Sequence, residues 1–523
     1  MPPIRVTDRV VVDRRDDRYF SFPDVTTLAD GRVLAAYRTA NVHYPPDPRT
    51  TRIRFRHGSR DGLVWSEPWE LAELPANLER TWFDCPRLTT LADGTVAMTL
   101  NLGGSPGPGG IIESTWLATS TDGGLTWTRL RELPLVGIVP DRLHILDDGR
   151  WLVSAHYHVP DGPYRLVQKA IASDDGGASF GPETLVAGDP ALQLCEVSLL
   201  PRGGGRIDAF LREDQGVRYP TLCATSRDGG RTWGALEPHP SRGHRITTGL
   251  LADGRMFATY RNVAGLPATC AWLGSPDARG SVPSGVRLEP ATATLEGDAL
   301  LLDTTDGGAL EYGHDPLESL AESTLTIEAE VRVLDAEPAA AVLRGGALLR
   351  LRPDHLELEA CGDLAPYVHA LDLTRFRCVR LTLSHGQASV SVDGERLFTA
   401  PLGRDLPRTA RVVAFGNLPQ PARGAYRYVE NRGRSLWRSV AIEVTNPRLP
   451  GYRWSWSADG GDFPDREERD HQAVLWLESS GQVFDHGYTG WTRLTDGALL
   501  VINYARGDAP KPAIHAYRVV VDG

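Results

Sequence analysis

The chain has 523 residues, enough for about two to four domains, and its 67 acidic and 56 basic residues give a formal charge of −11. Nucleic acids and anionic membranes select basic surfaces, so this balance argues against both as the main partner. The composition of 41% hydrophobic residues, 54 Gly, 38 Pro and 13 Trp favours a folded, turn-rich, all-β protein over a helical bundle or a disordered chain. No apolar run approaches the length that crosses a bilayer.

The N-terminal residues and the cysteines predict the compartment. Residues 1–17 contain neither the apolar core nor the cleavage site of a secretory leader, so we expect a cytoplasmic protein, or a secreted one from which a leader was removed. The six cysteines are scattered, without CxxC or Cys/His spacing. We therefore expect buried thiols, with no disulfide framework and no metal site.

One phrase recurs from the N-terminus onward: an apolar strand, a Leu-x-Asp-Gly turn and a second apolar strand. An Asp-Gly pair between two β-patterned runs is a strong hairpin signal, and it predicts type I′ turns. The first five copies are about 50–60 residues apart, the period of a four-stranded propeller blade. With the last copy they predict six blades. The turns are at Asp30-Gly31, Asp93-Gly94, Asp148-Gly149, Gly204, Asp253-Gly254 and Asp496-Gly497.

A second repeat, the Asp box S-x-D-x-G-x-x-W, lies between these hairpins. Its Ser and Asp side chains can bond the turn's own backbone, and its aromatic residue can fill the gap between neighbouring sheets. We expect these boxes to be structural, without a catalytic role. The copies are Ser59–Trp65, Ser120–Trp127, Ser173–Phe180, Ser226–Trp233 and a degenerate Ser457–Phe463.

The repeat stops after Arg261, and the next hairpin comes only at Asp496. Residues 285–448 instead show alternating strands joined by short polar turns, which resemble a laminin-G or concanavalin-like β-sandwich. We therefore expect propeller blades one to five over residues 1–284, an inserted sandwich over 285–448, and a closing blade over 449–523. The insertion would serve either as a carbohydrate-binding module or as a wall of the site.

Blade starts are the expected place for a functional site, because the innermost strands of a propeller converge on one mouth. Counting back eight or nine residues from each Asp-Gly turn places polar or charged residues at most of these starts. They enter otherwise apolar strands, which predicts a shared polar funnel. The positions are Ser21, Asp84, the Val139–Asp141 turn, Glu196, Arg245 and Tyr488.

Asp boxes on six blades resemble the sialidase (neuraminidase) superfamily, and the resemblance covers the chain outside the insertion. It implies that Tyr488 is a nucleophile and that Glu196 takes its proton, since a phenol of pKa about 10 needs such a partner. It further implies that Asp47, in the loop after residue 40, is the acid and base. Arg212 and Arg245 resemble two of the arginines that hold a substrate carboxylate. No cofactor is implied.

The first blade departs from the family pattern. The Arg-Ile-Pro phrase of the family is Ser21-Phe22-Pro23 in this chain, so the first arginine of the triad is absent. Arg38 stands near the place of a family glutamate and is a candidate to supply the lost charge. Asp84 would contact a sugar hydroxyl or cap a turn.

Three functions remain open from the sequence. The resemblance favours a retaining exo-glycosidase that removes a terminal acidic sugar, sialic acid or a related one, from a glycan. A polysaccharide lyase acting on uronates is the second, because propellers also support β-elimination. The third is a glycan-binding propeller without catalysis. The sequence does not predict the oligomeric state.

Overall fold

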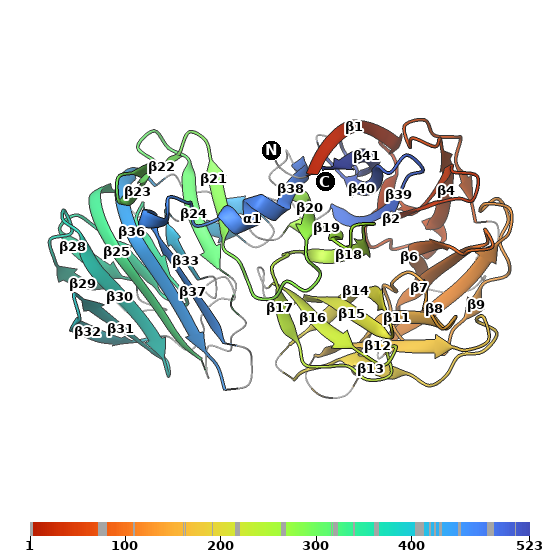
Figure 1. Ribbon diagram of the computed structural model, residues 1–523, viewed down its shortest axis with the longest axis horizontal. Coiled ribbons are helices and arrows are strands. Elements are labelled where there is room, and N and C mark those ends of the chain that lie inside the picture. The colour runs from red at the N-terminus through yellow and green to blue at the C-terminus, as the bar shows by residue number, and fades with distance from the viewer. Residues whose placement is uncertain are drawn as a thin grey trace.

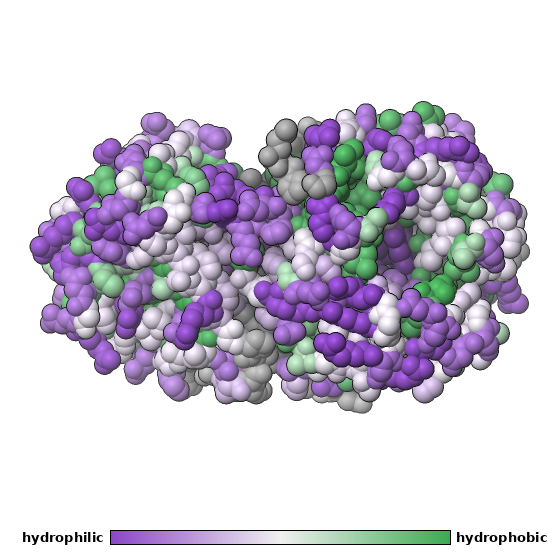
Figure 2. Space-filling view, in the orientation of Figure 1, coloured by the Kyte–Doolittle hydropathy of each residue, from purple (hydrophilic) through white to green (hydrophobic). Residues whose placement is uncertain are grey.

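The computed structural model describes residues 4–71, 81–107, 110–160, 162, 164–190, 192–214, 220–262, 268–314, 316, 323–337, 340–359, 366–402, 413–417, 420–422, 425–427, 431–447, 451–477, 486–507 and 509–522. The fold is all-β and has two lobes, a six-bladed propeller and a second β domain (Figure 1). This confirms the predicted fold class. In Figure 2 hydrophilic residues cover most of both lobes, and the propeller face in view is hollowed at its centre.

Each blade is a four-stranded antiparallel sheet. Blade one contains β2 (Tyr19–Thr27), β3 (Val33–Ala40), β4 (Arg52–Gly58) and β5 (Trp69–Glu70). Blade two contains β6 (Thr81–Thr90), β7 (Val96–Gly107), β8 (Gly110–Ser120) and β9 (Arg131–Glu132). Blade three contains β10 (His144–Ile145), β11 (Trp151–His158), β12 (Leu166–Ser173) and β13 (Thr184–Ala187). Blade four contains β14 (Leu194–Gly203), β15 (Arg206–Glu213), β16 (Thr221–Ser226) and β17 (Glu237–His239).

The last two blades are each completed by a strand that is remote in sequence. Blade five contains β18 (His244–Leu250), β19 (Met256–Asn262), β20 (Ala268–Gly274) and β38 (Gln472–Leu477). Blade six contains β39 (Gly487–Arg493), β40 (Leu499–Ala505), β41 (Ala513–Val521) and β1 (Ile4–Asp13). Because β1 pairs with β41, the N-terminal strand closes the ring.

Two larger sheets form the second domain. One contains β21 (Ser284–Leu288), β24 (Ala309–His314), β33 (Val413–Gly416), β26 (Val342–Arg344), β27 (Leu348–Leu351), β28 (His355–Leu358) and β29 (Tyr367–Ala370). The other contains β22 (Thr292–Glu296), β23 (Ala299–Asp303), β36 (Gly433–Thr445), β25 (Thr324–Ala336), β30 (Arg377–Ser384), β31 (Gln387–Val392), β32 (Glu395–Pro401) and β37 (Tyr452–Ser457). The remaining elements are β34 (Gln420–Ala422), β35 (Ala425–Arg427), the helix α1 (Arg466–His471) and the 3₁₀ turns Pro48–Thr50 and Ala458–Gly460.

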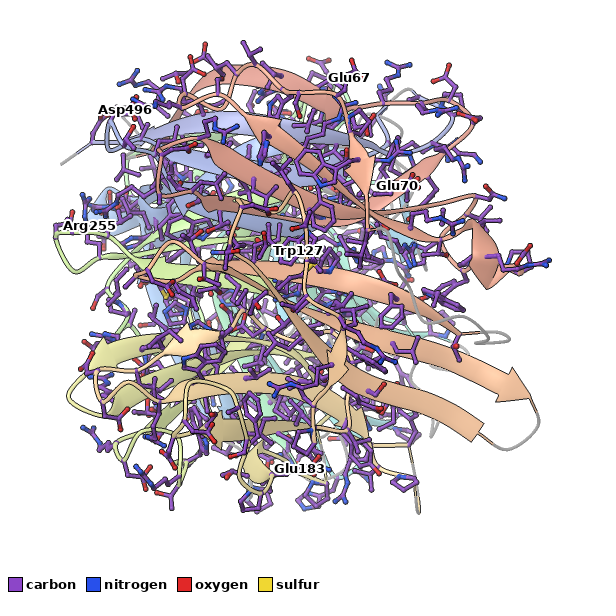
Figure 3. All side chains as sticks on the ribbon, turned by 90° about the vertical axis from the view of Figure 1, so that its right-hand side faces the viewer. Glu67, Glu70, Trp127, Glu183, Arg255 and Asp496 are labelled. Atoms are coloured by element: carbon purple, nitrogen blue, oxygen red, sulfur yellow. The ribbon has the colours of Figure 1, made fainter. Side chains whose placement is uncertain are left out.

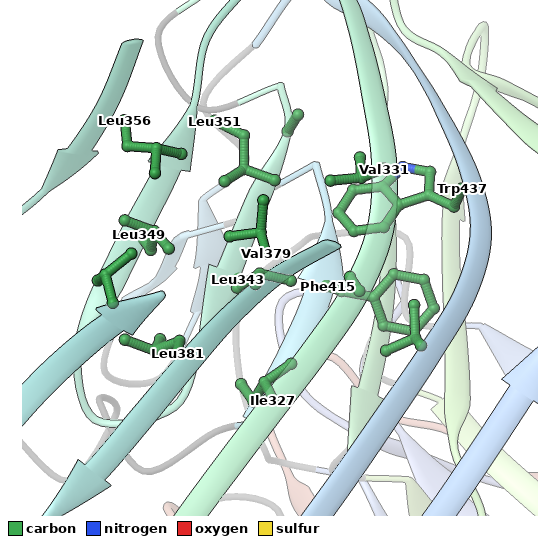
Figure 4. Close-up of a cluster of buried hydrophobic side chains, with 14 of the residues drawn as sticks. Ile327, Val331, Leu343, Leu349, Leu351, Leu356, Val379, Leu381, Phe415 and Trp437 are labelled. Carbon is green, nitrogen blue, oxygen red and sulfur yellow. The ribbon is translucent and has the colours of Figure 1, made fainter. Parts of the chain in front are cut away.

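The two sheets of the second domain share one apolar core. Burial alternates along β25, as expected for a strand with one face in a core. Side chains of both sheets meet there, among them Leu343 and Phe415 of the first sheet and Ile327 and Trp437 of the second (Figure 4). The domain is therefore a β-sandwich in architecture, and its likeness to laminin-G or concanavalin domains stays a prediction.

The insertion differs in place from the prediction. It leaves the propeller after β20 and returns at β38, so it interrupts blade five instead of lying between blades five and six. Residue 448 is too early for its end, because β37 beyond that residue still pairs with β36. The degenerate fifth Asp box belongs to this domain too, since Phe463 packs against the sandwich core. The predicted closing blade, 449–523, is correspondingly too long.

The hairpins form where they were predicted, and the fourth has the two consecutive positive-φ residues of a type I′ turn, Gly204 and Gly205, but the Asp-Gly hairpins have a different turn type. In the first one Gly31 N donates to Leu28 O (2.9 Å) and Leu28 N donates to Arg32 O (2.8 Å). Only Gly31 has a positive φ (85°), and Asp30 does not. This is a three-residue loop with a glycine in the left-handed region, whereas type I′ needs two such residues. Asp30 stabilises it by accepting from Arg32 N at 2.9 Å.

The Asp boxes are structural, as predicted. In the second box Ser120 Oγ accepts from Gly124 N (2.8 Å), and Asp122 accepts from Thr126 N (2.9 Å). The box's Trp127 stacks on Phe55 of blade one, with ring centroids 5.2 Å apart. The third and fourth boxes repeat these backbone bonds. Each box therefore fixes its own turn, and Trp127 fills the gap between two blades.

The described cysteines Cys85, Cys195, Cys223, Cys270 and Cys378 are free thiols, and Cys361 lies outside the described residues. Within the described chain no helix is long and apolar enough to cross a membrane.

Candidate active site

The innermost strands of five blades are bulged near their starts. The ladder register shifts at Ser21/Asp24 in β2, Asp84/Arg87 in β6, Leu194/Val197 in β14, His244/Thr247 in β18 and Gly487/Gly490 in β39. A bulge inserts a residue and turns its side chain. All predicted blade-start positions except the Val139–Asp141 turn of blade three lie in or beside these bulges.

Several bulge residues also have a left-handed backbone that is rare outside glycine. Positive φ angles occur at Phe22 (54°), Cys85 (49°), Val139 (49°), Arg245 (53°) and Tyr488 (50°). Such conformations persist only where the surrounding structure imposes them, and they cluster at functional sites. The recurrence in five blades marks the funnel end of the inner strands as the place to look for chemistry.

Tyr488 and Glu196 meet across the propeller from blades six and four. The Tyr488 hydroxyl donates a short hydrogen bond to Glu196 Oε1. Arg212 Nη1, from β15, lies 2.9 Å from each Glu196 oxygen and 3.2 Å from the Tyr488 hydroxyl oxygen. Arg212 Nη2 also pairs with Asp214. The structure therefore brings together the predicted nucleophile, its predicted base and one predicted arginine.

Burial and charge set the protonation of this triad. Glu196 is only 2% exposed; although burial disfavours its charged form, Arg212 holds the pKa of its carboxyl well below the usual range. Burial and the Glu196 carboxylate raise the pKa of Tyr488 well above that of a free phenol, against the opposing effect of Arg212 and Arg261. At neutral pH the proton therefore lies on Tyr488, and Glu196 is ready to accept it.

Arg261 is a site residue that the sequence analysis missed. Its guanidinium carbon lies 5.0 Å from the centre of the Tyr488 ring, and its Nε donates to His486 O at 2.6 Å. A cation over this ring stabilises a phenolate. The signal was present in the sequence, because three arginines come eight residues after a hairpin turn and lie on the second strand of their blade. They are Arg38 after Asp30 on β3, Arg212 after Gly204 on β15, and Arg261 after Asp253 on β19.

Arg38 reaches the place of the missing arginine, and each of its three nitrogens already has a partner. It is 1% exposed and donates to Ser21 Oγ (3.0 Å), Asp84 Oδ2 (2.8 Å) and His43 O (2.7 Å). Asp84 also accepts from Trp82 Nε1 at 3.2 Å. Arg38 and Asp84 therefore form a buried pair in the wall of the funnel.

Arg245 does not join the group formed by Tyr488, Glu196 and Arg212. It is 1% exposed and donates to the backbone carbonyls of Val197 (3.4 Å) and Pro140 (3.3 Å). Among the described residues, Arg245 makes no recorded contact with Tyr488.

Asp47 lies on the loop 41–51 and is bound to its neighbour Arg49. The distance from Arg49 Nε to Asp47 Oδ1 is 2.9 Å, and no described contact joins Asp47 to Tyr488 or Glu196. The same loop carries His43, whose carbonyl oxygen accepts from Arg38 Nη2 at 2.7 Å and whose ring lies edge-on to Phe22 with centroids 5.6 Å apart. Since the Phe22 ring also lies 4.9 Å from the Tyr488 ring, the loop borders the site.

A buried charge network lies on the propeller axis. Asp24 is completely buried and accepts from Arg142 Nε (2.9 Å) and Leu88 N (2.8 Å). Arg142 also donates to Trp491 O at 2.9 Å. The network ties the inner strands of blades one, two and six together, which fixes the position of Tyr488 on β39. No cluster of three or more His, Cys, Asp or Glu able to hold a metal occurs among the residues described.

Comparison with known proteins agrees with this architecture. Residues 31–281 match the family model of the BNR repeat-like domain, and no curated protein matches the chain. The whole chain is similar to the whole of a protein of unknown function from Dyadobacter fermentans DSM 18053, at 15% identity and a TM-score of 0.52. It is also similar to a mutant of Trypanosoma rangeli sialidase displaying trans-sialidase activity, at 11% identity and a TM-score of 0.38 over 86% of this chain and 97% of that one.

A further match is the Hadza microbial sialidase Hz136, at 14% identity and a TM-score of 0.41 over 49% of this chain and 56% of that one. At these identities the likeness concerns the fold alone. The chain is a six-bladed β-propeller that carries an additional β domain, and residues 31–281 of it are similar to the BNR repeat-like domain.

Proposed function

We propose that this protein is a retaining glycoside hydrolase that removes a terminal acidic sugar from a glycan. The observation that carries the proposal is the contact of the Tyr488 hydroxyl with the Glu196 carboxylate, with Arg212 bonded to both groups. A neutral nucleophile paired with a buried carboxylate and next to guanidinium groups suits attack on a centre that bears or neighbours an anion.

In the first step the Tyr488 oxygen forms a bond to the anomeric carbon as the bond to the departing oxygen breaks. The Tyr488 proton passes to Glu196, whose low pKa requires that this transfer accompany bond formation. Arg212 and Arg261 stabilise the negative charge that develops on the phenol oxygen. Asp47, once it has released Arg49 and taken up a proton from solvent, gives that proton to the departing oxygen.

In the second step a water attacks the anomeric carbon of the glycosyl-tyrosine. Asp47 accepts the proton of that water, and the Tyr488 oxygen leaves with the proton held by Glu196. The two displacements retain the configuration of the sugar. Both steps use groups of the chain alone.

The test is mass spectrometry of products from a panel of sialosides and uronate-capped glycans, with Tyr488→Phe as the matched control. We expect a released sugar that contains one added water, and a loss of at least about a hundredfold in rate for Tyr488→Phe. A fluorinated sugar that traps the intermediate should add its mass to the peptide containing Tyr488. An unsaturated product would instead indicate a lyase, and turnover unchanged in Tyr488→Phe would overturn the proposed nucleophile.

A further inference from the structure

Blade one has a cavity of about 300 Å³ at the ends of β3 and β4. It is lined by the side chains of three arginines, Arg18, Arg49 and Arg52, and by Thr39 and Glu70 among others. Figure 3 shows Glu70 on the opposite side of the propeller from Arg255 and Asp496, which belong to two of the hairpin turns. The cavity therefore opens away from the hairpin turns.

The charge of this cavity is positive in a protein of formal charge −11. Its one lining carboxylate, Glu70, is bound to Arg54 Nη2 at 2.8 Å and lies farther from Arg52 Nε, at 3.7 Å. Asp47 is bound to Arg49. Arg18 donates to the Asn41 amide oxygen at 3.1 Å, and the described residues provide no ion pair for it. Arg52 Nη1 also donates to the backbone carbonyls of Arg49 (2.5 Å) and Thr51 (2.7 Å). Arg18 thus keeps its charge available for an anion, and the charge of Arg52 is balanced only by the long ion pair with Glu70.

Thr39 adds a second, independent indication. Its side chain lines the cavity and is 1% exposed, and its hydroxyl has no hydrogen-bond partner in the described structure. Buried polar groups are nearly always paired, so an orphaned hydroxyl beside guanidinium groups suggests that a ligand supplies the partner. A hydroxyl donor together with guanidinium forks is the recognition set of an oxyanion.

The cavity and the candidate active site share one loop. Arg38 and Thr39 are consecutive in β3, so their side chains point to opposite faces of the blade: Arg38 faces the funnel, and Thr39 faces the cavity. The loop 41–51 borders the site through His43, whose carbonyl oxygen accepts from Arg38 Nη2 at 2.7 Å, and the cavity through Arg49. A chain molecule with its terminal residue at Tyr488 would cross this loop to reach the cavity.

We infer that the cavity is an oxyanion subsite, which binds a carboxylate or sulfate group on a sugar farther along the glycan. The inference deepens the proposed function and rests on it for the identity of the ligand as a glycan. The guanidinium groups of Arg18 and Arg52 hold the oxyanion, and the Thr39 hydroxyl donates to it. The protein therefore prefers substrates with a second anionic sugar.

The test measures equilibrium binding to the full chain in the Tyr488→Phe background, which prevents turnover. The probes are an oligogalacturonate tetramer, which has carboxylates only, a heparin-derived tetrasaccharide, which also has sulfate esters, and neutral cellotetraose. The test variant is Arg18→Gln/Arg52→Gln. Arg32→Gln is the matched control, since Arg32 is an exposed arginine of the same blade that pairs with Asp30 at the hairpin end.

We expect the acidic probes to bind and the double variant to weaken them about tenfold or more, with less than a twofold effect of Arg32→Gln. Binding should also weaken as salt is raised. Heparin binding alone identifies a sulfate ester, and equal binding of both acidic probes identifies a carboxylate.

Absence of binding by both acidic probes, equal binding of cellotetraose, or no difference between the double variant and the control would overturn the inference. The proposed hydrolase activity is tested separately by the turnover assay, in which unchanged turnover of Tyr488→Phe would contradict it. The binding measurements require no catalysis, so the two proposals can fail independently.

Discussion

Glu196 and Arg212 should be strongly coupled in their contributions to the free energy of unfolding, and this coupling can be measured before any substrate is known. Glu196 is buried, the Arg212 side chain is 13% exposed, and Arg212 Nη1 lies 2.9 Å from each carboxylate oxygen. Removal of Arg212 leaves the Glu196 charge buried without an ion pair, at a cost of about 3–5 kcal/mol, whereas removal of Glu196 leaves Arg212 its pair with Asp214. Arg212→Met should reduce the free energy of unfolding by roughly this amount, and Glu196→Gln by less. The double variant should cost at least about 2 kcal/mol less than their sum.

The assay is urea unfolding at pH 7, followed by tryptophan fluorescence, for the wild type, the two single variants and the double variant. Tyr488→Phe is the control for the hydrogen bond alone and should cost about 0.5–1.5 kcal/mol. The reasoning is refuted if the two single costs add to the double cost within about 0.5 kcal/mol, since independent sites behave in that way.

Two further predictions concern stability. Gly149 and Gly177 have similar φ angles, 84° and 83°. A Cβ added at Gly149 would meet no atom within 4 Å, whereas a Cβ added at Gly177 would lie 2.4 Å from a ring carbon of Trp151. Both Ala variants should lose about 1 kcal/mol to the backbone, and Gly177→Ala about 1–3 kcal/mol more; equal urea midpoints would contradict this. Burial lowers the pKa of His156 to about 4. Between pH 6.5 and pH 4 this imidazole is therefore protonated in the unfolded chain and neutral in the folded one. As pH falls from 6.5 to 4, the wild type should lose about 3 kcal/mol more of its free energy of unfolding than His156→Asn. Parallel plots of the free energy of unfolding against pH for the two proteins would exclude this.

The repeat pattern was sufficient to predict the blades, because each hairpin requires a glycine at a positive φ. It was insufficient for the turn type. An Asp-Gly pair suits both a two-residue loop and a three-residue one, and only the backbone bonds distinguish them. In the first hairpin Gly31 N donates to Leu28 O, which selects the longer loop.

For the candidate site, position along the inner strands predicted which residues approach the axis but not where their side chains point. Tyr488 and Glu196 come together as expected. Arg245 stands at an equivalent place in its blade and has the same left-handed backbone as Tyr488, yet its guanidinium donates to backbone carbonyls. The direction of such a side chain depends on the neighbouring strands, so sequence spacing alone does not contain it. Arg261 was missed although it stands in β19 at the place that Arg38 and Arg212 occupy in β3 and β15, because the family resemblance pointed only to the other two.

The place of the inserted domain explains how the propeller tolerates it. The chain leaves and re-enters between the third and fourth strands of blade five, at the outer edge of the sheet, while the inner strand β18 stays continuous. The returning segment contacts both lobes: Glu468 accepts from Gly285 N of the sandwich at 3.1 Å, and the His471 ring stacks on Trp272 of blade five at 5.5 Å. The insertion is thus anchored at the rim, and the bulged inner strands that position Tyr488 and Glu196 form independently of it.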